Sequence, residues 1–353
     1  MGNDKTEIMG LKRSKIIDFF NKNRIEQDYR ADQILRWIYN HRVMDFEEMS
    51  NLPGRVRDVL KKNAKLTLPP EVEVFRDGGT IRFVFQDGND DAPAVFEAVL
   101  ITDERTDSQI RKTVCISSQA GCNLGCSFCA TGRMGFKRNL TASEIIGQLY
   151  YIASYETEGQ PITNVVFMGM GEPLQNLENV IDSIEIIKSD PGFGIGARKI
   201  TVSSAGLVPE ILKLAESGHK VRLAISLNAS NDKLRKELMP IAERYSIDEI
   251  LEAVETFYEA TGRWVTLEYV MMEGINDSVE NAKELAEKIG EHNVKVNLIP
   301  YNPVEGLDYR RPELGIIQQF QARLLANGVT ATIRNSQGSN IDAACGQLAG
   351  RSL

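Results

Sequence analysis

Three of the five cysteines in this chain of 353 residues lie within eight positions of one another. Cys122, Cys126 and Cys129 follow the spacing CxxxCxxC in a segment rich in glycine, whereas Cys115 and Cys345 stand apart. Thiolates crowded into such a segment are typical of metal ligands. Structural zinc takes four ligands and the three histidines are distant in sequence, whereas a [4Fe–4S] cluster held by three thiolates keeps one iron open. The spacing therefore favours an iron–sulfur cluster over zinc.

The composition is that of an ordinary globular protein, with 42% hydrophobic and 25% charged residues. No apolar run reaches the roughly 20 residues that a membrane helix needs, and the N-terminal segment lacks the apolar core of a signal peptide. Five cysteines do not make a disulfide framework. We therefore expect a cytoplasmic protein, in a reducing compartment and without a membrane partner.

Charge is unevenly distributed along the chain, whose formal net charge is −8. Residues 1–70 carry 14 Lys and Arg against 10 Asp and Glu, so the remainder has a net charge of −12. The two basic regions would suit a polyanion held locally, although charge alone favours an ordinary solvated surface. The second region, 108–143, has no acidic residue and contains Arg111, Lys112, Arg133, Lys137 and Arg138.

The first seventy residues show helical periodicity. Apolar residues recur at the spacing of one helix face within 16–20 and within 31–38. The breakers "SNLPG" and "LTLPP" then predict a small helical bundle that closes near residue 66. Trp37, Tyr39 and Phe46 could stack bases, but aromatic residues at helical spacing favour core packing.

Beyond the helical bundle the pattern changes twice. Residues 71–101 alternate with period two and predict a short antiparallel sheet, and after residue 110 strands and helices alternate. Six such units predict an α/β fold with a parallel sheet, either open or curled into a partial (β/α)6 barrel. The predicted domains are 1–66, 67–106 and 107–353. The predicted strands of the barrel are 112–118, 164–170, 199–205, 221–227, 264–271 and 295–301.

Several polar motifs come directly after these predicted strands. Ligands in parallel sheets collect at the carboxyl ends of the strands, so we expect the motifs to meet at one edge. They resemble the RlmN/Cfr family of radical S-adenosylmethionine (SAM) enzymes, which methylate adenosine in RNA. The resemblance is carried by "SSQAGCNLGCSFCATGRMGFKRNL" (117–140), "MGMGEP" (168–173), "VNLIPYNP" (296–303) and "GSNIDAACGQLAG" (338–350), and by "YRADQILRWIYNHRVMDFEEMSNLP" (29–53) in the helical module.

The resemblance is closer to RlmN than to Cfr, because Pro173 follows "MGMGE". It implies a radical SAM barrel with an RNA-binding accessory domain at 1–66. It also implies methylation of adenosine C2 in 23S rRNA and tRNA, with two SAM molecules per turnover and an electron donor such as flavodoxin or ferredoxin. We expect a monomer. The alternatives are methylation at C8, as in Cfr, and a zinc-containing RNA-binding module without catalysis.

The same resemblance implies roles for the isolated cysteines. C2 of adenine is electron-poor and cannot attack the methyl carbon of SAM as a nucleophile, whereas a thiolate can. Cys345 would accept the methyl group and then join the ring through a thioether. Cys115 would release the product and leave a Cys115–Cys345 disulfide, and Glu97 would accept the ring proton.

The cofactor-binding residues also follow from the resemblance. Cys122, Cys126 and Cys129 would hold the [4Fe–4S] cluster. Glu172 would face the amino group of SAM, because a carboxylate opposes an ammonium, and glycine would let the backbone approach. Asn228 stands where the family usually has histidine, so an acid–base role at that position is in doubt. The expected SAM contacts are Gly171, Glu172, Ser203, Ser226, Leu227, Asn228 and Asn302.

Overall fold

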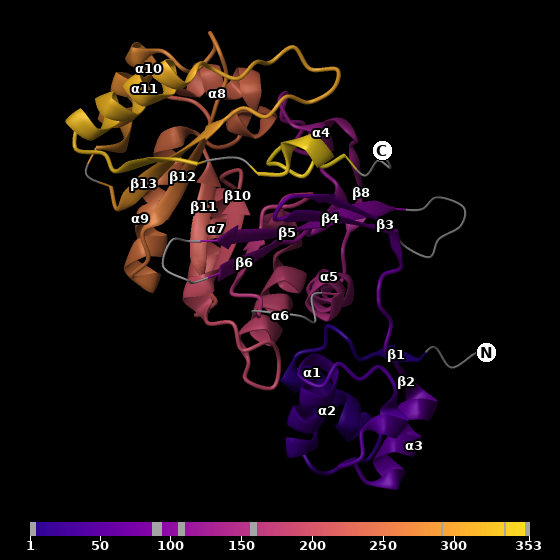
Figure 1. Cartoon of the computed structure of the whole chain (residues 1–353). Coiled ribbons are helices and arrows are strands. Elements are labelled where there is room, and N and C mark those ends of the chain that lie inside the picture. Colours follow the sequence, from indigo (N-terminus) through magenta and orange to yellow (C-terminus); the bar gives the residue numbers. More distant parts are fainter. Residues whose placement is uncertain are drawn as a thin grey trace.

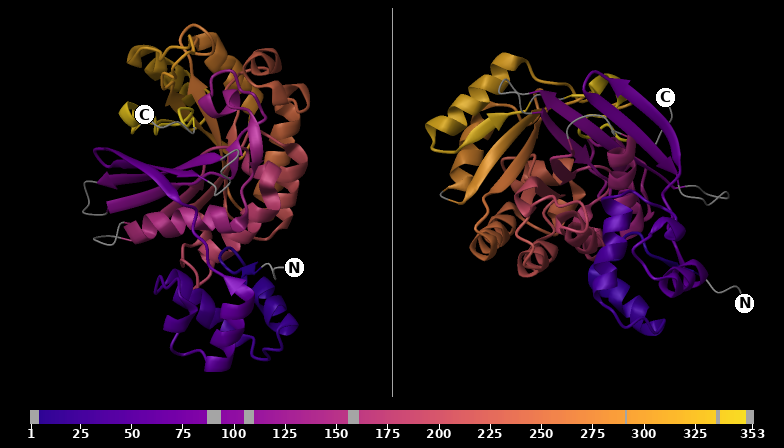
Figure 2. Two further views of the ribbon diagram at one scale, coloured as in Figure 1. Left: turned by 90° about the vertical axis from the view of Figure 1, so that its right-hand side faces the viewer. Right: turned by 60° about the horizontal axis from the view of Figure 1, so that its bottom comes forward.

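The computed structural model describes residues 5–86, 94–104, 110–155, 161–290, 292–334 and 337–349. A small helical module, drawn in indigo in Figure 1, lies below a curved sheet. Helices cover the outer side of that sheet (Figure 2). No helix in this described part of the chain is both long and apolar enough to span a membrane.

The helical module is built around the apolar faces that periodicity predicts. Ile16, Phe20 and Ile34 are fully buried in it. Tyr39 and Phe46 are also buried, which confirms their prediction as core residues, whereas Trp37 is only half-buried. Strands β1 and β2 pair in parallel and bring the two ends of the module together. The elements are β1 (Thr6–Glu7), α1 (Arg13–Lys22), α2 (Tyr29–Tyr39), η1 (Phe46–Glu48), α3 (Gly54–Asn63) and β2 (Ala64–Lys65).

Among the described residues, the main sheet has ten strands in the order β14-β13-β12-β11-β10-β9-β6-β5-β4-β3. The strands from β6 to β14 are parallel, and β5, β4 and β3 extend this sheet as antiparallel strands. Their bounds are β3 (Glu71–Asp77), β4 (Thr80–Gln86), β5 (Val95–Glu104), β6 (Ile110–Cys115), β9 (Asn164–Phe167), β10 (Ile200–Ser204), β11 (Arg222–Ser226), β12 (Val265–Met271), β13 (Val294–Pro300) and β14 (Ala331–Ile333).

The predicted α/β fold is confirmed. The six predicted parallel strands are β6 and β9 to β13, and they form the curved sheet of a partial barrel. A seventh parallel strand, β14, escaped prediction because three residues are too few to show a periodicity. The division of the chain into three domains stays a prediction.

Helices follow most of the parallel strands and pack on the outer side of the sheet. The sequence marks some of their ends locally. For example, Ser246 and Glu249 form a capping box at the start of α9. A short ribbon, β7 (Gln119–Gly121) and β8 (Phe136–Asn139), flanks α4 (Ala130–Arg133). The other helices are α5 (Ala142–Tyr155), η2 (Pro173–Asn176), α6 (Leu177–Lys188), η3 (Ala197–Lys199), α7 (Val208–Glu216), α8 (Asp232–Leu238), η4 (Pro240–Glu243), α9 (Ile247–Thr261), α10 (Val279–Ile289), α11 (Leu314–Ala326) and η5 (Ser339–Ile341).

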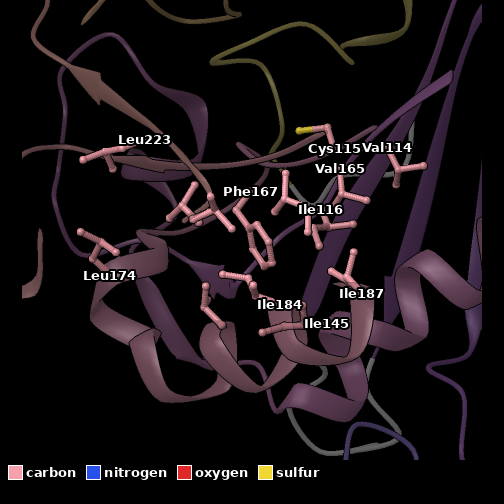
Figure 3. Close-up of a cluster of buried hydrophobic side chains, with 14 of the residues drawn as sticks. Val114, Cys115, Ile116, Ile145, Val165, Phe167, Leu174, Ile184, Ile187 and Leu223 are labelled. Atoms are coloured by element: carbon pink, nitrogen blue, oxygen red, sulfur yellow. The ribbon is translucent and has the colours of Figure 1, made fainter. Parts of the chain in front are cut away.

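The pleat of β6 separates the core from the inner face of the sheet. Val114 and Ile116 are fully buried and pack with Phe167 and Ile184 between the sheet and its helices (Figure 3). Cys115 lies between them in sequence and points to the opposite side (Figure 3). Since successive side chains of a strand alternate between faces, the packing of its neighbours presents Cys115 to the inner face.

Ion pairs fix the helical module against α6. The buried carboxylate of Asp182 accepts a hydrogen bond from Lys15 at 2.5 Å and pairs with Lys12 at 3.2 Å. Arg36 pairs with Asp190 at 2.8 Å. The module therefore lies on the far side of the sheet from α4 and the C-terminal segment (Figures 1 and 2).

Candidate active site

The segment with three cysteines is fixed at its start by the β7–β8 ribbon. The backbone N–H of Cys122 donates to the carbonyl of Gly135 at 3.1 Å. Gly121, just before it, has a φ of +74°, and a Cβ atom there would lie 1.9 Å from the same carbonyl oxygen. Only glycine fits this close approach, so the glycines of the motif set the path of the backbone.

Two other parts of the chain hold the middle and end of the same segment. Ser127 donates from its backbone N–H and its hydroxyl to the carbonyl of Leu238, at 3.0 and 3.2 Å. The N–H of Ala130 donates to the carbonyl of Gly346 at 2.9 Å. The cysteine segment therefore lies between the end of α8 and the C-terminal segment that carries Cys345.

The three cysteines of the segment form one electrostatic group. Burial raises the pKa of the Cys122 thiol to about 12. Burial also raises the pKa of Cys126, and repulsion from the Cys129 and Cys122 thiolates adds to that shift. Burial likewise raises the pKa of Cys129. Three such thiolates need a positively charged centre, so this donor set fits an iron–sulfur cluster.

The positions of the side chains differ from those of a single-ion site. Within the described ranges, no group of three or more His, Cys, Asp or Glu side chains could hold a metal ion. The thiolates of a cubane each bind a different iron, so their sulfur atoms do not have to converge on one point. The assignment of Cys122, Cys126 and Cys129 as cluster ligands stays a prediction.

The two isolated cysteines lie within electrostatic reach of each other. Burial raises the pKa of Cys115 to about 12, the charge of Cys345 adds to the shift, and the guanidinium of Arg334 opposes it. The charges of Cys345, Glu268 and Cys115 in turn raise the pKa of Arg334. The structure thus brings together two cysteines from opposite ends of the barrel sequence, within electrostatic reach of a partly buried cation that sequence reasoning missed.

Glu97 lies on the same face of the sheet as Cys115. In the register, Val99 is opposite Cys115, and Glu97 is two residues before Val99 on β5. Its carboxylate is fully buried, 3.6 Å from the guanidinium of the equally buried Arg82. Arg82 was also missed, although a charged residue within the apolar strand "TIRFVFQ" could have identified it. A buried carboxylate with a cationic partner is a candidate proton acceptor.

The "MGMGEP" segment passes very close to β7. Gly171 has a φ of +91°, and a Cβ atom there would lie 2.4 Å from the Cβ atom of Gln119. The backbone N–H of Glu172 donates to the Gln119 side-chain oxygen at 2.8 Å. Ser117 adds a second link, because its hydroxyl accepts from the N–H of Met170 at 2.7 Å. These bonds fix the segment beside the cysteines.

The carboxylate of Glu172 is committed to the backbone. Its two oxygens accept hydrogen bonds from the N–H groups of Leu174 and Ala205, at 3.1 and 2.8 Å. Burial raises the pKa of Glu172 to about 7 against the effect of these bonds. Glu172 therefore joins the segment after β9 to the end of β10, a positioning contact that the sequence did not reveal.

The remaining predicted SAM contacts also lie at the carboxyl ends of parallel strands. Ser203 is on β10, Ser226 ends β11, and the N–H of Leu227 donates to the carbonyl of Glu268 at 2.9 Å. Asn302 comes two residues after the end of β13. The structure thus brings these residues to one edge of the sheet, as expected for a parallel arrangement.

The two asparagines at this edge have structural hydrogen bonds. Asn228 has a φ of +61°, a conformation that asparagine tolerates, and its buried side-chain oxygen accepts from Val270 at 2.9 Å. This bond ties the loop after β11 to β12. Asn302 donates to the carbonyl of Cys345 at 3.2 Å and accepts from Arg311 at 3.2 Å. It therefore helps to hold the segment of Cys345.

Comparison with known proteins agrees with this arrangement. Residues 116–296 match the family model of the radical SAM superfamily, and residues 6–66 match that of the ribosomal RNA large subunit methyltransferase N-terminal domain. Two relatives named "Dual-specificity RNA methyltransferase RlmN" are each 41% identical to this chain. The relative from Francisella tularensis subsp. novicida covers 99% of this chain and 94% of its own. The relative from Psychrobacter arcticus covers 98% of this chain and 88% of its own.

A solved structure is equally similar over its whole length. The crystal structure of a radical SAM methyltransferase from Sphaerobacter thermophilus matches with a TM-score of 0.90 and 41% identity, covering 98% of this chain and 100% of that one. The two relatives and the solved structure each match across both the helical module and the barrel. The chain therefore belongs to the RlmN family of radical SAM RNA methyltransferases.

Proposed function

We propose that this protein methylates C2 of adenosine in 23S rRNA and in tRNA, through a methylated cysteine and a transient protein–RNA thioether. The printed name of its relatives, a dual-specificity RNA methyltransferase, supports the two substrates. The observation that carries the mechanism is the proximity of Cys115 and Cys345, with Glu97 on the same face of the sheet.

Cys122, Cys126 and Cys129 hold the cluster in this proposal. When bound, a [4Fe–4S] cluster supplies the electron that cleaves SAM reductively. Two SAM molecules are used per turnover, one as the methyl donor and one as the source of the radical. The residues that would hold SAM lie along one edge of the sheet, and they are Gly171, Glu172, Ser203, Ser226, Leu227, Asn228 and Asn302.

Cys345 takes the first methyl group. Its thiolate attacks the SAM methyl carbon, the bond from that carbon to the sulfonium breaks, and S-adenosylhomocysteine leaves. Arg334 places a positive charge within electrostatic reach of Cys345. Asn302 holds the backbone of the same residue.

Glu97 and Cys115 complete the reaction on the RNA. The radical takes a hydrogen atom from the methyl group on Cys345, and the resulting methylene radical adds to C2. Glu97 accepts the proton from that ring carbon, and loss of one electron to the cluster restores the aromatic ring as a thioether. The Arg82 guanidinium compensates the charge of the Glu97 carboxylate. Cys115 then attacks the sulfur of Cys345. The carbon–sulfur bond of the thioether breaks, and its electron pair goes to the methylene carbon, which takes up a proton and becomes the methyl group of adenosine. A Cys115–Cys345 disulfide is left for a cellular dithiol to reduce.

RNA is held by the helical module and by the basic region beside the cysteines. Of the cations predicted between residues 108 and 143, Arg133 and Lys137 are exposed, next to the cysteine segment. Arg138 is paired with Glu144 at 2.6 Å, and Lys112 is buried. The proposal includes a cytoplasmic monomer that receives its electrons from a flavodoxin or a ferredoxin.

Nucleoside mass spectrometry tests the proposal. The anaerobically reconstituted protein is incubated with SAM, a one-electron reductant and unmodified 23S rRNA, and the digested RNA is compared with authentic 2-methyladenosine and 8-methyladenosine. We expect 2-methyladenosine, and none with Cys345→Ala. Formation of 8-methyladenosine would contradict the proposed carbon. A colourless protein that binds zinc and leaves RNA unchanged would contradict catalysis itself.

A further inference from the structure

Helix α8 presents a buried arginine toward the cysteine segment. The helix ends at Leu238, whose carbonyl accepts both hydrogen bonds from Ser127, between Cys126 and Cys129. Arg235 lies one turn earlier on the same helix and is completely buried. The end of the helix is thus fixed to the middle of the cysteine segment, and Arg235 lies behind that contact.

Arg235 forms its hydrogen bonds with backbone carbonyl groups rather than with a carboxylate. Its guanidinium donates to the carbonyl oxygens of Ala205 and Tyr245, at 2.6 and 3.2 Å. Across the residues that the structure describes, no carboxylate lies within 4.0 Å of it, and its Nε atom has no hydrogen-bond partner. Burying a cation that no anion contacts costs free energy, so we expect a negatively charged group close to Arg235 in the functional state.

Cys126 exerts the largest electrostatic effect of any acidic group on Arg235. Burial lowers the pKa of Arg235 to about 10, and Cys126, ahead of Asp232, opposes this shift. Reciprocally, Arg235 favours the thiolate of Cys126. The carbonyl of Ala205 that Arg235 binds belongs to the same residue whose N–H is bound by Glu172. Two carbonyl groups therefore hold Arg235 within electrostatic reach of Cys126.

We propose that Arg235 is the internal counter-cation of the iron–sulfur cluster and raises its reduction potential. The inference rests on the proposed cluster site but not on which carbon of adenosine is methylated. Three thiolates and a [4Fe–4S]2+ core carry a net charge of −1, and one added electron makes it −2. A fixed cation stabilises the more negative state more strongly, so the cluster becomes easier to reduce.

The same charge makes the cluster and the fold depend on each other. Without the cluster, Arg235 is a buried cation that forms no ion pair with any described carboxylate, which destabilises the fold. With the cluster, the charge is neutralised. The stabilisation gained on cluster binding should therefore contain a contribution from Arg235.

A redox titration of Arg235→Gln tests the inference. Glutamine removes the charge but retains an N–H donor for the carbonyl of Ala205. The cluster-loaded variant is titrated anaerobically with dithionite and followed by electron paramagnetic resonance. We expect the ratio of reduced to oxidised cluster at a fixed potential to fall about tenfold, which corresponds to about 59 mV for one electron. Lys236→Gln, which removes an exposed charge from the same helix, should leave the ratio unchanged.

A second readout separates charge from packing. The thermal midpoint of the loaded form minus that of the cluster-free form should be smaller in Arg235→Gln than in the wild type, because hydrogen bonds common to both forms cancel. Arg235→Lys keeps the charge and should retain the wild-type potential. If Arg235→Gln does not accumulate, the reduction potential of Arg235→Lys tests the inference. A more negative potential in that variant would contradict the inference, because the charge is retained and only the geometry of the guanidinium is lost.

An unchanged potential in Arg235→Gln, with full iron content, would overturn the inference and leave Arg235 as a structural donor to two carbonyls. This outcome is distinct from failure of the cluster site itself. In that case Cys122→Ala would retain all its iron, whereas failure of the inference alone leaves iron binding dependent on the cysteines.

Discussion

The helical module and the carboxyl edge of the sheet distribute polar groups in opposite ways. In the module, residues such as Ile16 and Ile34 fill the interior, and pairs such as Arg13–Asp32 lie at the surface. At the edge of the sheet, Glu172 and Asn228 are buried and bonded to backbone. We therefore expect the module to contribute through charged side chains at its surface, and the edge of the sheet to depend on the positions of its buried hydrogen bonds. Changes in the module should have graded effects, and changes at the edge should be close to all-or-none.

The largest effects are expected at the two isolated cysteines. Cys345→Ala should accept no methyl group, because the attacking sulfur is gone, and the reaction should stop before RNA is modified. Cys115→Ala should still be methylated and should still add to adenosine. It lacks the thiol that breaks the carbon–sulfur bond, so a protein–RNA adduct should accumulate.

Mass spectrometry of the isolated proteins and a gel run with and without nuclease distinguish these outcomes. A nuclease-sensitive shift in Cys115→Ala, absent from Cys345→Ala, is expected. The reverse pattern would exchange the two roles. If both variants turned over like the wild type, both cysteines would be structural. Substitutions at the edge of the sheet would then not have the all-or-none effect on activity that we expect there.

The next largest effect separates the two regions directly. Deletion of residues 1–66 should reduce RNA methylation on the order of a hundredfold, because several phosphate contacts are lost. Cleavage of SAM without RNA should change little, since every predicted cofactor contact lies beyond residue 97. Both rates are measured on the same preparation, with circular dichroism as the control for folding. Methylation at the full rate would show that the module does not hold RNA.

This contrast also explains what the sequence could and could not predict. The helices of the module and the six strands follow from periodicity, because apolar side chains repeat at 3.6 or 2 residues. The cysteine segment follows from residue type and spacing. Arg334 and Arg235 carry no local pattern, because their role depends on charges that only the fold brings near. Similarly, the bonds from Glu172 to Ala205 and from Asn302 to Cys345 join residues far apart in sequence.

A smaller effect is expected from the titration of Glu172 in cluster-free protein. Burial raises the pKa of this group from 4.5 to about 7 in the folded state. The folded state therefore binds the proton more tightly, and this stabilisation is complete below pH 4.5 and is lost as pH rises through about 7. At about 1.4 kcal/mol per pKa unit, the free energy of unfolding should fall by about 3 kcal/mol.

Urea denaturation at about pH 5 and about pH 8 measures this effect. Glu172→Gln does not titrate, so its free energy of unfolding should change less between the two pH values than that of the wild type. Its absolute stability should be lower, because an amide cannot accept hydrogen bonds from both Leu174 and Ala205 through two oxygens. Equal pH profiles would mean that these N–H donors keep the carboxylate ionised, so that its charge rather than its protonation stabilises the edge.

The smallest effect is expected at Lys137. We expect this lysine, at the edge of the active site, to contact RNA through its charge, as the surface residues of the module do. Lys137 is exposed on β8, beside the cysteine segment, and no ion pair is found for it in the described structure. Lys137→Gln should weaken binding of unmodified 23S rRNA only a few-fold and lower the salt slope by about 1, because one phosphate contact is lost.

Filter binding between about 50 and 200 mM salt measures this slope. Lys283→Gln is the matched control, because Lys283 is an exposed lysine on α10, one of the outer helices. If both variants keep the wild-type slope, Lys137 does not contact phosphate, and the RNA grip would lie in the helical module alone. If Lys137→Gln instead abolished methylation with affinity unchanged, Lys137 would act through geometry, like the buried residues of the edge. The distinction between graded effects of surface substitutions and all-or-none effects of interior substitutions would then not hold at the edge of the active site.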